Sequence, residues 1–351
     1  MLPPDGTPEA ELINLLFSNK LAPMYLLNSK TPSERKYRAG NSSSFPVANL
    51  ISLFPLHCPC FQRDIKQNKV SNIGWVRHAF GTALVLFFVL CSVTQAQTHA
   101  GTFTESEIKE FIAAYNTEDP RTQVGAWQRA MPHPERNPKF AEFQAQILKV
   151  WESSEFAPYK LDDPLLLAQV QKIVEPVLRL YGRENSFKLI IIKHHIPVAM
   201  NDSGALLMIS TGLIERATSD DEILGHVAHE LGHDLRWQRT AQARETLELY
   251  KQGTGTKLGA RQAKEELAKI ELECDAFSAL TLALLGRNPL PFARYLEAVE
   301  RDYPDYVPPD LPPTALRARV IEGISPVTAA HVPLRASEAL TNLKAVLAAR
   351  L

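Results

Sequence analysis

The five residues from His229 to His233, which read His-Glu-Leu-Gly-His, restrict the fold more than any other feature. Residues four apart lie one turn apart on the same face of a helix, so both imidazoles reach one metal ion only if this segment is helical. Glu230 then lies beside the ion without ligating it, where it can act as a general base. By composition alone the pattern arises by chance in roughly one chain in a hundred, so an ordinary surface helix stays open on the motif alone.

A second acidic cluster, Glu271-Leu272-Glu273-Cys274-Asp275, supplies the missing parts of such a site. A catalytic zinc site needs three protein ligands and one open position, and Glu271 is the expected third ligand. Asp275 lies four residues on, hence on the same face, and is expected to accept the other ring N–H of a ligating histidine. Glu273 is the rival ligand, but an ideal helix points it away from that face. The alternative is that these carboxylates are solvated helix charges.

The motifs occur in an order that resembles the HtpX-like zinc metallopeptidases, a group that includes the CAAX prenyl proteases and the mitochondrial Oma-type enzymes. The resemblance covers about residues 170–321. It implies an α+β, mainly helical, zincin-type metalloprotease domain with a small β-sheet and an active-site helix. It also implies one Zn²⁺ per chain, held by His229, His233 and Glu271, with Glu230 as the base and Asp275 supporting a ligand. The matching stretches are Ser210-Thr211-Gly212-Leu213, Asp221-Glu222-Ile223-Leu224 before His229, and Glu271 to Asp275.

The sequence departs from the family pattern at three places. Cys274 stands where the family often has alanine, and we expect it to be a packing residue. Val198-Ala199-Met200-Asn201 stands where the family has Asn-Ala-aromatic. The late His-Pro-Pro…Arg pattern lacks its histidine and ends at Arg317, which is expected to pair structurally or to hold the oxyanion, with the structural role preferred.

The other histidines near the motif are not expected to bind the metal ion. His226 is expected to be a packed residue, because a fourth protein ligand would close the open position of a catalytic site. His194 and His195 follow a strand and are expected at the surface.

The N-terminal part of the chain predicts export. The uncharged run from Ala79 to Val93 follows basic residues and precedes Thr94-Gln95-Ala96, which is the pattern of a signal peptide over 70–96. Residues 1–69 show no sustained helical or strand period and form a doubtful leader, and translation from near Val70 would omit them. Residues 97–351 are then a single metallopeptidase domain that is periplasmic or secreted. The protein is membrane-anchored only if the signal is not cleaved.

Local patterns predict a mainly helical domain with two strands. Thr104 and Glu107 have the spacing of a capping box, and so do Ser219 and Glu222 at the start of the motif helix. Trp237 is expected in the core. The expected helices are 104–115, 138–152, 164–181, one from 219, 261–285 and a terminal pair of short helices; the expected strands are 187–192 and 205–210.

These observations together predict an exported zinc metalloendopeptidase that acts on unfolded or misfolded exported proteins, in quality control of the cell envelope. An extended substrate is expected to add to an exposed edge of the strand at 205–210. The formal net charge of −1 gives no global electrostatic case for a nucleic acid partner or an anionic membrane. Two alternatives stay open: a non-catalytic chaperone-like or assembly factor with the same fold, and a latent peptidase whose cleft is covered by a loop such as 306–313.

Overall fold

The computed structural model describes residues 103–350 except 117–118, 134, 136–137, 153–158, 203, 305–306, 308–310 and 326–336. The described residues all belong to one compact unit. The expected leader (1–69) and signal peptide (70–96) lie outside them, as do residues 306 and 308–310 of the loop 306–313. None of the described helices is long and apolar enough to cross a membrane.

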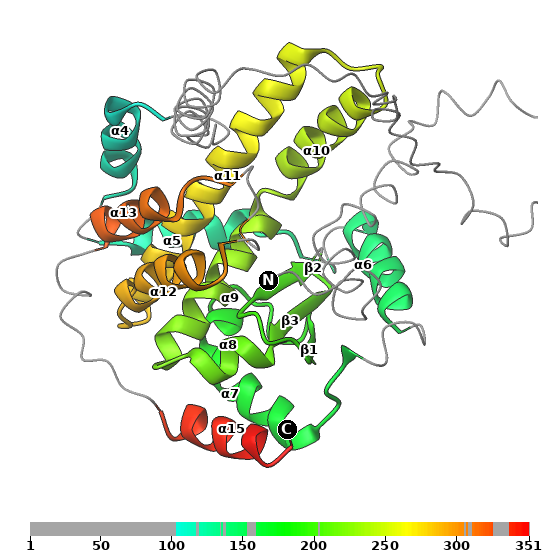
Figure 1. Ribbon diagram of the computed structural model, residues 1–351, viewed down its shortest axis with the longest axis vertical. Coiled ribbons are helices and arrows are strands. Elements are labelled where there is room, and N and C mark those ends of the chain that lie inside the picture. Colours follow the sequence, from blue (N-terminus) through cyan, green and yellow to red (C-terminus); the bar gives the residue numbers. More distant parts are fainter. Residues whose placement is uncertain are drawn as a thin grey trace, which may run out of the picture. The chain divides into compact units, whose positions relative to one another are not determined.

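Helices make up most of this unit and enclose one small sheet (Figure 1). Strands β1 (Lys188–Ile192), β3 (Leu206–Ser210) and β2 (Ala199–Asp202) follow one another in that order across the sheet. The architecture is therefore α+β and mainly helical, as expected. The helices are α4 (Glu105–Tyr115), α5 (Arg121–Ala130), α6 (Pro138–Trp151), α7 (Pro164–Leu180), α8 (Thr211–Arg216), α9 (Asp220–Leu235), α10 (Trp237–Lys251), α11 (Lys257–Leu284), α12 (Leu290–Asp302), α13 (Thr314–Ile324) and α15 (Glu338–Ala348).

The order of the strands corrects one expectation. Strand β3 pairs in parallel with β1 and antiparallel with β2, so it is the central strand and has no exposed edge. All five of its residues are buried, which explains why its apolar run was so easily recognised. The short strand β2, which the sequence did not reveal, forms the edge of the sheet that lies next to α9.

The motif helix α9 crosses the core and packs closely against α11. Gly232 makes this approach feasible, because a Cβ atom there would lie 3.0 Å from both Cα and Sγ of Cys274. A Cβ at Gly225 would lie 2.5 Å from Cβ of Phe292 on α12. A larger residue at Gly225 would push α9 away from α12, and one at Gly232 would push α9 away from α11, so Gly232 sets the distance between the two motifs.

The helix starts agree with the sequence in one case and differ in another. Thr104 and Glu107 form the expected capping box at α4. Ser219 is the N-cap of α9 but makes no side-chain capping bond. Instead the Glu222 carboxylate accepts from the backbone N–H of Thr218 (3.1 Å) and from its hydroxyl, so the reciprocal contact begins one residue earlier than expected.

Helix α12 was not among the expected helices, and it begins with two prolines. Pro289 is the N-cap of α12 and Pro291 lies in its first turn. Proline is tolerated there because the first helical N–H groups have no partner within the helix.

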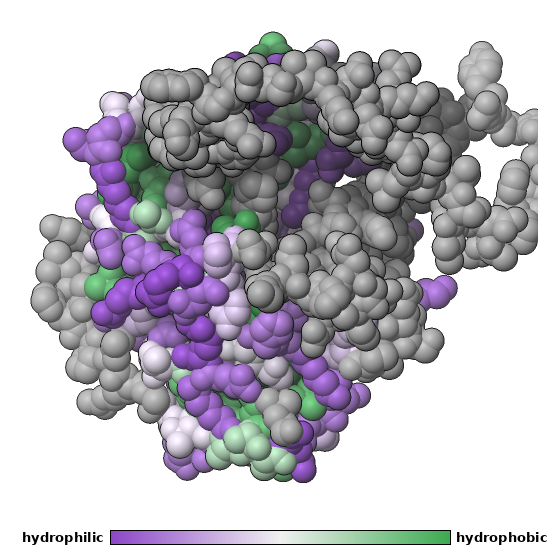
Figure 2. Space-filling view, viewed as in Figure 1, coloured by the Kyte–Doolittle hydropathy of each residue, from purple (hydrophilic) through white to green (hydrophobic). Residues whose placement is uncertain are grey.

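The outer surface of α12 is polar. On the face in view, mainly hydrophilic side chains lie over this helix (Figure 2).

Candidate metal centre

Three side chains from two helices converge on one point. His229 and His233 come from α9, and Glu271 comes from α11. Nε2 of His229 lies 3.2 Å from Nε2 of His233 and 3.3 Å from Oε2 of Glu271. Nε2 of His233 lies 3.5 Å from Oε1 of Glu271. Across the described residues, this is the group of histidine, cysteine and acidic side chains that could hold a metal ion.

These separations match the geometry of a four-coordinate ion. Ligand atoms bonded at about 2.0–2.1 Å in a tetrahedron lie about 3.3 Å from one another. The separation of the two imidazoles is close to that value, and each imidazole lies 3.3 or 3.5 Å from its nearest oxygen of Glu271, Oε2 for His229 and Oε1 for His233. The side chains of His233 and Glu271 are 24% and 15% exposed, so the group reaches the surface on one side. The chain therefore offers three converging ligand atoms and an open approach.

Asp275 and Arg317 fix the orientation of His229. Nδ1 of His229 donates to Oδ1 of Asp275 at 2.9 Å, which leaves Nε2 to face the centre. Arg317 on α13 donates to both carboxylate oxygens of Asp275, from Nε at 2.9 Å and from Nη2 at 2.8 Å. Burial by itself would raise the pKa of Asp275, but Arg317 outweighs it and holds that pKa below its usual value. Arg317 therefore makes a structural ion pair with Asp275, which is the role that the sequence analysis preferred to holding the oxyanion.

The ligands perturb one another's ionisation. Burial by itself would lower the pKa of His229, but its hydrogen bonds to Asp275 and Glu271 raise it to about 9. Burial lowers the pKa of His233 to about 4. Burial opposes the charged form of Glu271, yet the two histidines and Arg317 bring its pKa far below the usual range. The Glu271 carboxylate is thus kept in the charged form that a metal ligand needs.

Glu230 lies next to the ligands and is held by strand β2. The backbone N–H of Asn201 donates to its Oε2 at 2.9 Å, and the side-chain amide of Asn201 donates to its backbone carbonyl at 2.9 Å. Burial raises the pKa of Glu230 to about 7. A carboxyl group with such a pKa can accept and return a proton near neutral pH.

Behind this strand lies a buried ion pair that the sequence analysis missed. Arg183 is fully buried, and its Nη2 lies 3.1 Å from Oδ2 of Asp234, the residue after His233. Oδ1 of Asp234 accepts from the side-chain amide of Asn201 at 2.7 Å. The network therefore joins the end of α9 to the strand that holds Glu230. Asp234 adjoins the motif and could have been suspected, whereas nothing in the sequence around Arg183 points to this contact.

The residues that were set aside as ligands lie outside the ligand group. Glu273 points away from the ligand group, as expected, and forms ion pairs with Arg236 and Arg239. Cys274 is a buried free thiol that packs against Gly232.

Among the histidines, His226 donates from Nδ1 to the carbonyl of Glu222 at 2.8 Å and packs against aromatic rings. His195 is exposed, but the expectation of a surface position for His194 is wrong. His194 is buried at the end of β1, where its backbone hydrogen-bonds the hydroxyl of Thr211. Trp237, expected in the core, is only partly buried, at the start of α10.

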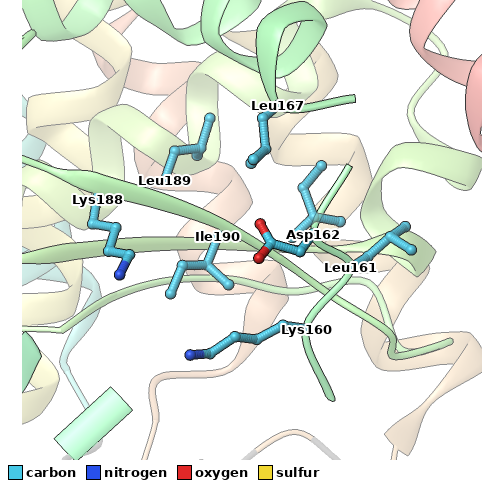
Figure 3. A pocket seen from close by; sticks show the side chains of 8 residues that line it. Lys160, Leu161, Asp162, Leu167, Lys188, Leu189 and Ile190 are labelled. Atoms are coloured by element: carbon cyan, nitrogen blue, oxygen red, sulfur yellow. The ribbon is translucent and has the colours of Figure 1, made fainter. Parts of the chain in front are cut away.

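A small pocket lies elsewhere on the sheet. Lys160, Asp162, Lys188 and neighbouring aliphatic residues line it along β1 (Figure 3). None of its lining residues belongs to the candidate metal centre.

Comparison with known proteins gives no match. No family model matches the chain, and no curated protein matches it either.

Proposed function

We propose that this protein is a zinc-dependent endopeptidase with a zincin-type domain, related to the HtpX-like metallopeptidases. The observation that carries the proposal is the convergence of His229, His233 and Glu271, whose ligand atoms approach one another to 3.2–3.5 Å, with Glu230 alongside. Two imidazoles and one carboxylate are the donor set of catalytic zinc sites that leave a fourth position open. A bound zinc ion would supply Lewis-acid polarisation of the scissile carbonyl and of the attacking water.

The protein groups around that position have complementary tasks. Glu230 takes the proton from the attacking water and passes it to the leaving amine. The N–H of Asn201 holds one oxygen of the Glu230 carboxylate in place. Asp275, held by Arg317, keeps His229 in the tautomer and the orientation that a ligand needs. Arg317 thus acts through Asp275 and, with Nη2 3.7 Å from Oε2 of Glu271, also on that ligand, and the residue that holds the oxyanion is left unassigned.

The substrate edge moves from β3, where we first expected it, to β2. Ser210 of β3 donates to the carbonyl of Val198, and pairing continues at Met200 with Met208. Because alternate residues of a strand face opposite edges, the backbone groups of Ala199 and Asn201 face away from β3. Asn201 uses its N–H on Glu230, so a polypeptide that adds to this edge lies beside the proposed base. Main-chain pairing suits unfolded or misfolded exported proteins as substrates.

The location rests on the sequence alone. A signal peptide over 70–96 places the domain 97–351 in the periplasm or outside the cell, where envelope quality control is the proposed role. The chaperone-like alternative shares the fold and the polypeptide partner but does not need a metal ion. The latent alternative binds zinc and is inactive until a trigger opens the cleft.

Metal analysis paired with a proteolysis assay separates these alternatives. We expect one zinc per chain in the purified protein, cleavage of casein, and loss of cleavage with a chelator and recovery with added zinc. His233→Ala is expected to lose both the zinc and the activity. A folded protein without zinc that protects casein from aggregation would instead support the chaperone-like function. Zinc without cleavage would support the latent form.

A further inference from the structure

Helices α10 and α11 form a hairpin that reaches away from the sheet (Figure 1). Its base is held by charged contacts between the two helices. Arg239 donates to Glu266 at 2.6 Å and to Glu273 at 2.7 Å, and Arg236 pairs with Glu273 as well. The hairpin tip, which we define as residues 249–264, lies at the far end from these ion pairs. It comprises the last turn of α10, the connecting turn and the first turns of α11.

Near the tip of the hairpin, small side chains are buried and large apolar side chains are exposed. A helix pair that is stable by itself would bury the large apolar side chains instead. Its buried residues near the tip are small, namely Ala243, Ala260 and Ala263. Its large apolar side chains face solvent: Leu249 is 42% exposed, Tyr250 43% and Leu258 56%. In the described part of the chain, the other exposed large hydrophobic residue is Leu165, far away on α7. Exposed apolar groups concentrated in this way mark an interaction surface.

The connecting turn holds these side chains in a defined position. The backbone N–H groups of Thr254 and Gly255 both donate to the carbonyl of Leu249, at 3.0 and 2.9 Å. Gly253 has a φ of +76°, which favours glycine, and Thr256 caps α11 by accepting from the N–H of Gly259 at 3.0 Å. The apolar side chains are therefore presented by closed helix ends and a hydrogen-bonded turn.

The charges of the hairpin tip differ in sign from those of the whole chain. Residues 249–264 contain Lys251, Lys257, Arg261 and Lys264 and no acidic residue, in a chain of net charge −1. Lys251 and Arg261 lie 3.7 and 3.4 Å from the glutamates Glu248 and Glu265, in exposed pairs that are weak in water. The tip thus combines basic residues with exposed leucine and tyrosine.

We propose that the hairpin tip docks onto the surface of an anionic lipid bilayer. Leucine side chains favour the acyl boundary, tyrosine favours the headgroup level, and lysine and arginine reach the anionic headgroups. A protein partner is less well matched, because a stable protein interface needs about 1,000 Å² or more and a broader contact than one helical turn on each side of a loop. Docking at Leu258 would hold Glu271, thirteen positions further along α11, at most about 20 Å from the membrane surface.

The test uses the full chain and vesicles of two compositions, one of phosphatidylcholine alone and one of equal parts phosphatidylcholine and phosphatidylglycerol. We expect the anionic vesicles, and not the neutral ones, to slow amide hydrogen exchange in peptides from 249–264. This local readout distinguishes the hairpin tip from the apolar run at 79–93, which can bind lipid by itself. Anionic vesicles that bind the chain without protecting the tip would overturn the proposal.

Substitutions in the hairpin tip provide a second test of the proposal. The double substitution Leu249→Ser, Leu258→Ser is expected to lower tip protection and vesicle affinity at least about 10-fold, whereas Leu165→Ser leaves both unchanged. Lys257→Glu with Arg261→Glu should weaken binding and reduce its dependence on salt. Circular dichroism verifies that each variant is folded. Equal protection in the wild type and the double leucine variant would also overturn the proposal, whatever the zinc and cleavage assays show.

Discussion

The backbone N–H of Asn201 lies 2.9 Å from Oε2 of Glu230 and donates a hydrogen bond to it. An edge strand therefore positions the carboxylate next to the candidate ligands. The side-chain amide of Asn201 adds bonds to the carbonyl of Glu230 and to Asp234. Because the position of residue 230 depends on these contacts, its chemistry can be changed without disturbing the ligands.

Glu230→Gln is expected to retain metal and lose activity. The amide has the shape of the carboxylate but cannot take a proton from water, so casein cleavage should fall by about 10²- to 10⁴-fold. Zinc per chain should equal that of the wild type, because residue 230 is not among the converging ligand atoms. Glu215→Gln, at an exposed position on α8, is the matched control. Retained cleavage by Glu230→Gln would refute the role of this residue as base.

Substitution of Glu271 and Glu273, two of the glutamates on α11, tests which carboxylate is the ligand. Glu271→Ala removes one of the three ligand atoms, so zinc content should drop well below one per chain. Glu273→Ala should leave zinc content intact and lower the free energy of unfolding by about 1–3 kcal/mol, because Arg236 and Arg239 lose their common partner. Metal analysis and urea unfolding of both variants check this. Zinc loss in Glu273→Ala alone would reverse the assignment.

Local patterns were enough to predict much of the fold. The expected helices at 138–152 and 164–181 agree closely with α6 and α7, because apolar periodicity and proline at the helix start are properties of the local sequence. Strand β2 could not be recognised in the same way. It is four residues long, and its Met200, Asn201 and Asp202 are only partly buried, so its pairing with β3 decides its conformation.

In the candidate site too, contacts within one helix could be predicted from the sequence, and contacts between distant parts of the chain could not. Spacing of four residues on one helix was sufficient to group His229 with His233 and Glu271 with Asp275. The contact between the two pairs depends on how closely α9 and α11 approach at Gly232, which spacing does not encode. Asn201 and Arg183 were missed because their partners lie 29 and 51 positions away along the chain, and such contacts have no local signature.

Arg183→Met is expected to destabilise the protein strongly. The guanidinium is fully buried, donates to the carbonyls of Pro132 (2.8 Å) and Gly204 (2.9 Å), and pairs with Asp234. Its loss leaves the carboxylate of Asp234 buried without a cation, and burial already raises the pKa of Asp234 to about 6 with the arginine in place. Breaking such a pair costs about 3–5 kcal/mol.

A surface ion pair is the control for that experiment. Arg179 is 68% exposed and pairs with Glu175 one helical turn away on α7. Arg179→Met should change the free energy of unfolding by less than about 1 kcal/mol. Urea denaturation of both variants provides the comparison, and similar losses in the two would show that the buried network around Asp234 contributes little.

His226 should make the protein sensitive to acid. Burial lowers its pKa from 6.5 to about 3, and Nδ1–H donates to the carbonyl of Glu222. Above pH 6.5 the ring is neutral in both the folded and the unfolded chain, so it adds no pH dependence. As the pH falls below that value, the unfolded chain takes up a proton that the folded chain refuses, and the free energy of unfolding decreases until about pH 3.

The expected loss from this group is about 1–2 kcal/mol near pH 4.5, less than for a wholly enclosed ring because His226 is only partly buried. His226→Gln should remove this part of the acid dependence, while His195→Gln, at an exposed position, should not. Urea unfolding at a series of pH values measures both slopes. If His226→Gln loses stability with acid as steeply as the wild type, the sensitivity comes from other buried groups, of which Asp234 and the ligands are the nearest.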